Sequence, residues 1–176
     1  NSPDGNIWVQ VWYLRSDPLG SFDFELPTEL ITGTLTLEAV GAFGLWLVWQ
    51  GDVGALDAIW LAVFHSISAF CNAGFSLFGD SLVGFRERPA LVLVVASLVV
   101  AGGLGFPVIQ DLRYRLRSRH RRPSLHTRLV LGATAVLLAG STLLYLVFEW
   151  NHELQPLGIL DRIVNAFFMA VTARTA

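Results

Sequence analysis

The chain has 176 residues, of which 53% are hydrophobic and only 15% charged, and its mean hydropathy is +0.55. Soluble globular domains carry nearer a quarter charged residues, so a water-soluble protein is a poor interpretation. The net charge of −2 does not suggest nucleic-acid binding. The single cysteine, Cys71, excludes an internal disulfide and any multi-cysteine metal site.

Residues 1–28 are polar and rich in proline and acidic side chains, and the pattern predicts no definite structure for them. Residues 30–49 form the first candidate membrane span, because they are apolar over the length that a helix needs to cross a bilayer. The one charge of this segment is Glu38. Its end carries Trp46 and Trp49, which are typical of the membrane–water boundary.

Residues 58–79 are uncharged but unlike an ordinary span, since a helix-like start gives way to small and polar residues. Ser66, Ser68, Asn72 and Gly74 cluster where a lipid-facing helix would be apolar. Two topologies are open: the segment crosses the membrane, or it dips in and returns. The composition favours the second, because non-helical backbone at membrane depth is tolerated only when it is buried in protein or lines a water-filled cavity.

Residues 89–110 form the second candidate span, with Pro89 near its start. Glycines 102, 103 and 105 near its end predict either the close approach of another helix or a bend. Seven of the twelve arginines lie in residues 113–128, so the positive-inside rule predicts that this loop is cytoplasmic. Residues 129–148 form a third span, and a polar outer loop leads into an apolar segment over residues 159–176. The arginines chosen for the basic loop are Arg113, Arg115, Arg117, Arg119, Arg121 and Arg122.

Two short stretches of the chain repeat each other. Residues 64–69 (Phe-His-Ser-Ile-Ser-Ala) align with residues 168–173 (Phe-Met-Ala-Val-Thr-Ala), and each follows a span and a polar outer loop. Residues 64–75 and 171–176 closely resemble pore-loop motifs of the Trk/Ktr/HKT superfamily of potassium transporters, most like the Ktr-type membrane subunit. Residues 102–107 and 38–42 are also similar to that family. The resemblance covers residues 28–176.

This resemblance implies an all-α membrane protein that builds one pore from four helix–pore-loop–helix repeats, of which about one and a half are present. Residues 29–112 would be a complete repeat, 113–128 a basic cytoplasmic loop, and 129–176 the first helix and pore helix of the next repeat. We interpret the chain as a fragment cut at both ends. The resemblance further implies potassium as the substrate, with sodium as a second candidate, no bound cofactor, and a multi-pass plasma-membrane location.

The resemblance also suggests roles for individual residues. Backbone oxygens of the two loops would replace the hydration shell of the ion, and Gly74 is the first choice because glycine adopts the required backbone conformations without steric cost. The helix before Cys71 would aim the negative end of its dipole at the ion. The predicted filter residues are Cys71, Asn72, Ala73, Gly74, Thr175 and Ala176, and the predicted pore-helix supports are His65, Ser66, Ser68 and Thr172.

Two charges within the spans need partners, because ionisable groups are expensive at membrane depth. Glu38 should face the helix bundle. Arg174 should form a scaffold ion pair, with Glu149, Glu153 or Glu38 as its partner, and the sequence does not choose among them. The basic loop is explained by topology and anionic lipid contact. The resemblance adds a cytoplasmic nucleotide-binding regulatory ring, and a homodimer of the full-length subunit, as partners beside the lipid bilayer.

Three other classes of function remain open. The first is a secondary carrier whose discontinuous helices bind a small cation or solute at mid-membrane. The second is an intramembrane hydrolase using His65 and Ser66, which is disfavoured because adjacent helix residues do not face each other and no hydrolase motif accompanies them. The third is a membrane scaffold that transports nothing. The sequence therefore predicts a transporter rather than an enzyme.

Overall fold

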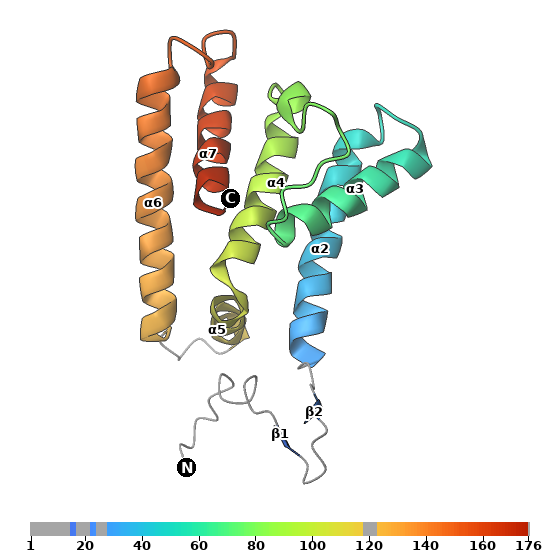
Figure 1. Ribbon diagram of the computed structural model, residues 1–176, viewed down its shortest axis with the longest axis vertical. Coiled ribbons are helices and arrows are strands. Elements are labelled where there is room, and N and C mark those ends of the chain that lie inside the picture. Colours follow the sequence, from blue (N-terminus) through green and yellow to red (C-terminus); the bar gives the residue numbers. More distant parts are fainter. Residues whose placement is uncertain (1–14, 17–21, 24–27, 118–122, 176) are drawn as a thin grey trace. The chain divides into compact units, whose positions relative to one another are not determined.

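The computed structural model describes residues 15–16, 22–23, 28–117 and 123–175. The chain divides into two compact units, Asn1–Thr36 and Leu37–Ala176. In the first unit, the two-residue strands β1 (Arg15–Ser16) and β2 (Phe22–Asp23) pair in antiparallel fashion. The other elements of the described residues are helices, in agreement with the predicted all-α class (Figure 1).

Helix α2 (Thr28–Trp49) corresponds to the first predicted span. Its threonines satisfy their own polar groups within the helix. Thr34 Oγ1 donates to the Leu30 carbonyl at 2.7 Å, and Thr36 Oγ1 donates to the Thr32 carbonyl at 2.6 Å. Such back-bonding lets hydroxyl groups lie in an apolar environment without a partner from another helix.

Helix α3 (Ala55–Phe70) begins after Gly54 and carries Asp57 in its first turn, where a negative charge is favourable. It has 16 residues. At 1.5 Å per residue it is about 24 Å long, which is shorter than the roughly 30 Å core of a bilayer. The chain then runs without regular structure to a short 3-10 helix, η1 (Val83–Phe85). Helix α3 therefore lacks the length of an ordinary span.

The second predicted span is broken in the structure. Helix α4 (Pro89–Leu104) ends before Gly105, and helix α5 (Phe106–Arg117) continues at an angle of 98°. The sequence left two outcomes open at the glycines near the end of this segment, the close approach of another helix or a bend, and the structure shows the bend. Gly105 has φ 80° and ψ 150°, a conformation that side chains with a Cβ rarely adopt.

Helix α6 (Leu125–Glu149) corresponds to the third predicted span and begins at Ser124, whose side chain accepts a hydrogen bond from the Thr127 N–H at 3.2 Å. Helix α7 (Ile159–Thr175) follows after a polar loop. Arg162 holds this loop by donating to the carbonyls of Leu157 at 2.9 Å and Gln155 at 2.6 Å.

Within the second unit, α4 packs against α3 on one side and α7 on the other, and α6 runs beside α7 (Figure 1). The core is formed where α3 and α4 meet the end of α2, around Leu45, Trp49, Ala62, Leu91 and Val95. By length and composition, α2 and α6 are able to cross a membrane, and α4 with α5 adds a third span if the bent pair counts as one. These helices are those of a membrane protein.

Candidate functional site

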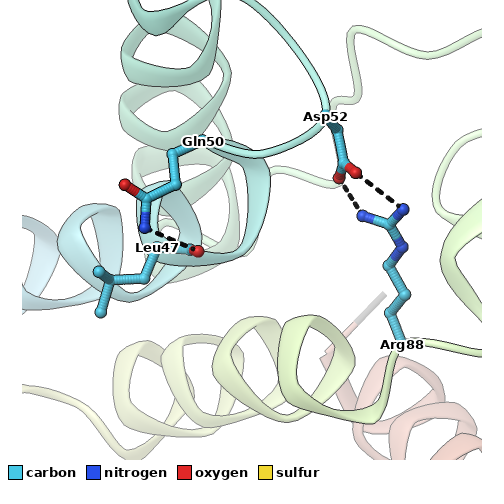
Figure 2. Close-up of polar contacts among 4 residues, drawn as sticks. All are labelled: Leu47, Gln50, Asp52 and Arg88. Atoms are coloured by element: carbon cyan, nitrogen blue, oxygen red, sulfur yellow. Dashed lines mark hydrogen bonds and ion pairs between the residues drawn. The ribbon is translucent and has the colours of Figure 1, made fainter.

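The two ends of the segment between α2 and α4 lie next to each other. Asp52, just before α3, pairs with Arg88, just before α4, through both carboxylate oxygens (Figure 2). The Arg88 Nη2–Asp52 Oδ1 distance is 3.1 Å. Hydrogen bonding to this guanidinium lowers the pKa of Asp52, so the carboxylate stays ionised at neutral pH. After α3 and the loop that follows it, the chain therefore returns at Arg88 to the neighbourhood of Asp52, where the segment began.

The far end of α3 lies part-way along its neighbours. Ser66 Oγ, which is fully buried, donates to the Glu38 carbonyl at 2.7 Å. Glu38 lies three turns before the end of α2, a depth of about 16 Å at the rise of an α-helix. Since the apolar core of a bilayer is about 30 Å thick, the end of α3 is near half that depth when measured along α2.

Helix α3 ends in a Schellman motif. The Asn72 N–H donates to the Ala69 carbonyl at 3.1 Å, and the Ala73 N–H donates to the Ser68 carbonyl at 2.9 Å. This pattern needs a left-handed residue after the cap, and Asn72 has φ 53°. Asparagine is the usual choice there after glycine. The turn explains why the helix stops at Phe70.

After this turn the backbone oxygens are left free. In the part of the chain that the structure describes, the carbonyls of Cys71, Asn72, Ala73 and Gly74 accept no hydrogen bond. Gly74 has φ 70°, and a Cβ there would meet nothing within 4 Å, so the glycine is needed for its backbone conformation rather than for space. Four consecutive unpaired acceptors at the end of a helix are a suitable site for a cation.

The segment that follows Gly74 is held to α3 by His65 and Ser68, which the sequence predicted as supports. Ser68 Oγ donates to the Phe75 carbonyl at 2.7 Å. The Nδ1 atom of His65 lies 2.8 Å from the Leu61 carbonyl, so it carries the proton. The Nε2 atom of His65 then accepts from Ser76 Oγ at 3.3 Å and from the Leu77 N–H at 3.4 Å. These partners assign the neutral Nδ1–H tautomer.

We expect His65→Phe to destabilise the protein by about 1–3 kcal/mol, because the Leu77 N–H loses its acceptor. Phenylalanine keeps the aromatic contacts, since the His65 ring lies 5.2 Å from the rings of both Trp49 and Phe78. Thermal unfolding of the purified protein in detergent measures the effect. The control is Phe64→Leu, a change on the same helix that leaves this hydrogen-bond network in place. Equal unfolding temperatures for His65→Phe and the unmutated protein would show that the ring contributes by packing alone.

A cavity of about 210 Å³ joins this turn to α7. Its wall includes His65, Ser68, Asn72 and Gly74 from the first segment, and Thr172 and Thr175 from α7. Thr172 Oγ1 donates to the Met169 carbonyl at 3.0 Å within its own helix. The structure thus brings together residues of the two sequence-related stretches.

The comparison with protein families decides what kind of molecule has this geometry. Residues 31–176 match the TrkH family model, described as a cation transport protein. The chain belongs to the TrkH family. This is a family of transporters rather than enzymes, which agrees with the prediction that the chain is not an enzyme and with its resemblance to Trk, Ktr and HKT proteins.

Several curated relatives are bacterial uptake proteins. The chain is 41% identical to the potassium/sodium uptake protein NtpJ of Enterococcus hirae, over 86% of this chain and 34% of that protein. It is 38% identical to the Ktr system potassium uptake protein B of Vibrio alginolyticus, over the same shares. The corresponding protein of Bacillus subtilis is 35% identical over 81% of this chain and 32% of its own length. The chain therefore spans about a third of the length of these relatives.

Glu38 and Arg174, the two charged residues of this TrkH-family chain that were expected to need partners, have different surroundings. The Glu38 carboxylate lies on the side facing α3, with Oε1 at 4.0 Å from Cys71 Sγ. Arg174 forms no ion pair with Glu149, Glu153 or Glu38 among the described residues, so that expectation is wrong. Instead, Arg174 Nη2 donates to the Gly103 carbonyl at 3.4 Å. A bend in α4 has produced a backbone acceptor that takes the place of a carboxylate.

The remaining predicted residues are placed as follows. Thr175 is the last residue of α7, and Ala176 lies outside the described residues. Arg113 and Arg115 are exposed on α5, Arg117 ends that helix, and Arg119, Arg121 and Arg122 lie outside the described residues. Two contacts of the site were not predicted from the sequence: the Asp52–Arg88 pair and the hydrogen bond between Ser76 and His65. Neither had a local signal, since each contact joins residues that are distant along the chain.

Proposed function

We propose that the full-length protein takes up potassium across the plasma membrane, with sodium as a second candidate substrate. The backbone carbonyls of Cys71–Gly74 form one side of its selectivity filter, and the backbone oxygens of Thr175 and Ala176 supply another side. Each of α3 and α7 is then a pore helix, and residues 29–112 form one helix–pore-loop–helix repeat. In this proposal no cofactor is covalently bound, and the ion is the substrate.

The observation that carries this proposal is the row of free carbonyls at the end of α3. A cation entering a pore gives up hydrating water, and backbone oxygens replace that water. The end of α3 adds the negative end of a helix dipole, which favours a cation further. The return of the chain to Arg88 supports a loop that enters the membrane and leaves on the same side.

The names of the relatives support the choice of ion. They are described as potassium or potassium/sodium uptake proteins, and belonging to a Ktr system suggests that the membrane subunit works with other components. For this chain we accordingly propose a homodimer of the full-length subunit and a cytoplasmic nucleotide-binding regulatory ring. The basic loop 113–128 faces the cytoplasm in this arrangement, by the positive-inside rule.

A secondary carrier is the competing proposal, and the break between α4 and α5 is the observation in its favour. Discontinuous helices line the substrate sites of many carriers. In a carrier, however, the carbonyls after α3 would form only one of several substrate-binding sites. Selectivity would then depend on residues at Gly105 as strongly as on Gly74. Comparing the ion preferences of variants at these two glycines separates the two mechanisms.

We expect Gly74→Ser to reduce the preference for potassium over sodium about tenfold or more. A left-handed conformation costs a residue with a Cβ about 1–2 kcal/mol, and tenfold corresponds to 1.4 kcal/mol. Rubidium and sodium uptake by cells that carry the complete protein and lack their own potassium uptake measures this preference.

The matched control is Gly79→Ser, because Gly79 has open space around it and no positive φ. If Gly74→Ser leaves both the uptake rate and the ion preference unchanged while the protein reaches the membrane, the filter assignment is wrong. An equal loss in the Gly79→Ser protein would mean that the outer loop as a whole is sensitive to substitution, and it would remove the special role of Gly74.

A further inference from the structure

The diglycine Gly102–Gly103 of α4 lies between the ends of the two helices that we propose as pore helices. A Cβ on Gly102 would lie 1.8 Å from the Phe70 carbonyl oxygen at the end of α3. A Cβ on Gly103 would lie 3.3 Å from Thr175 Cγ2 at the end of α7. One turn of α4 therefore touches both helix ends, and at Gly102 only a residue without a side chain allows this approach.

The carbonyl of Gly103 has lost its partner within the helix. In a continuous α-helix it would accept from the N–H of residue 107, but Pro107 has no N–H. The chain also turns away at Gly105, where φ is 80°. Arg174 Nη2 donates to this carbonyl at 3.4 Å, from the last turn of α7. The guanidinium thus satisfies an acceptor that the break in α4 has exposed.

The N–H of Gly103 is bound by the other pore loop. With its amide oriented to match its neighbours, Asn72 donates to the Val99 carbonyl at 3.1 Å and accepts from the Gly103 N–H at 3.2 Å. The opposite orientation would place acceptor against acceptor and donor against donor. Val99 and Gly103 are the two groups that one turn of an α-helix joins. The side chain of Asn72 therefore bridges one turn of α4, just before the end of this helix at Gly105.

We propose that Asn72 and Arg174 are positioning residues that fasten both pore loops to the backbone of one residue, Gly103, so that the bend of α4 and the shape of the filter are set together. This rests on the proposed function. Arg174 belongs to this contact and not to the general pore-helix pattern: in the alignment of residues 64–69 with 168–173, the next position holds Phe70 in one stretch and Arg174 in the other.

The test uses the full-length protein with Arg174→Gln, Arg174→Lys and Asn72→Ala. We expect Arg174→Gln to reduce the potassium-over-sodium preference about tenfold at an unchanged amount of protein in the membrane, because the Gly103 carbonyl loses its charged donor. Arg174→Lys retains a charged donor and should recover most of the preference. Arg128→Gln removes the same charge from an exposed site on α6 and should leave the preference unchanged.

A double variant that combines Arg174→Gln with Asn72→Ala tests whether both side chains act through their contacts with Gly103. If both side chains act through Gly103, the second substitution should reduce the preference less than it does alone, whereas independent roles give additive effects. Additive effects, or an unchanged preference in Arg174→Gln, overturn the inference. The pore assignment survives that outcome if Gly74→Ser still alters selectivity, and fails with it if Gly74→Ser does not. If the Arg174→Gln protein does not accumulate in the membrane, Arg174→Lys replaces it in the double variant with Asn72→Ala. Additive changes in ion preference would again overturn the inference.

Discussion

Replacing Gly102 with alanine is expected to abolish ion uptake by the full-length protein. The new methyl group would lie 1.8 Å from the Phe70 carbonyl oxygen and 2.9 Å from its carbonyl carbon. These are backbone atoms, so no side chain is able to rotate away, and α4 has to separate from the end of α3. Overpacking of this severity costs about 3 kcal/mol or more. Uptake of rubidium and thermal stability in detergent both measure the loss.

Gly140→Ala is the matched control for this change. Gly140 lies in the middle of α6, and a Cβ there would meet nothing within 4 Å. Alanine is favoured over glycine in a helix by about 1 kcal/mol, so this variant should be as stable as the unmutated protein or slightly more so. Normal uptake by Gly102→Ala would contradict the contact between α4 and the end of α3.

Replacing Gly105 with alanine is expected to have the second largest effect, through the backbone alone. Gly105 has φ 80° and ψ 150°, and the nearest atom to an added Cβ is Pro107 Cδ at 3.6 Å, an ordinary contact. The cost of about 1–3 kcal/mol therefore comes from conformational strain. The strain is relieved if the 98° bend opens, which would move the turn of α4 that contacts the ends of α3 and α7.

We expect Gly105→Ala to lower the uptake rate strongly and to change the ion preference less than Gly74→Ser does. Rubidium and sodium uptake in cells provides both values. Gly51→Ala serves as the control, because Gly51 lies in open space without a positive φ. Unchanged uptake by Gly105→Ala would mean that the bend has no part in transport, and that α4 and α5 serve only to cross the membrane.

The turn after α3 shows how far sequence reasoning reached. Asn72 and Gly74 were chosen because such residues rarely occupy the middle of a span, and both have positive φ in the structure. The supporting roles expected of Ser66 and Ser68 correspond to hydrogen bonds to the Glu38 and Phe75 carbonyls. Their polarity was visible in the sequence, but their acceptors were not.

The span over residues 89–110 shows the opposite case. Hydropathy alone predicts a continuous helix, because it records how apolar a window is and not the direction of the chain within it. The information on the break was present in Gly105 and Pro107, yet the same residues are compatible with simple helix packing. Only the backbone angles at Gly105 distinguish the two.

The sequence by itself determined which segments are apolar and which loop carries the positive charge, because hydropathy and charge are properties of neighbouring residues. The tertiary structure alone decided that Arg174 binds the Gly103 carbonyl instead of a carboxylate, and that Asp52 meets Arg88. A hydrogen bond depends on where two distant parts of the chain meet. Several acceptors of similar strength were available to each arginine, and packing chose among them.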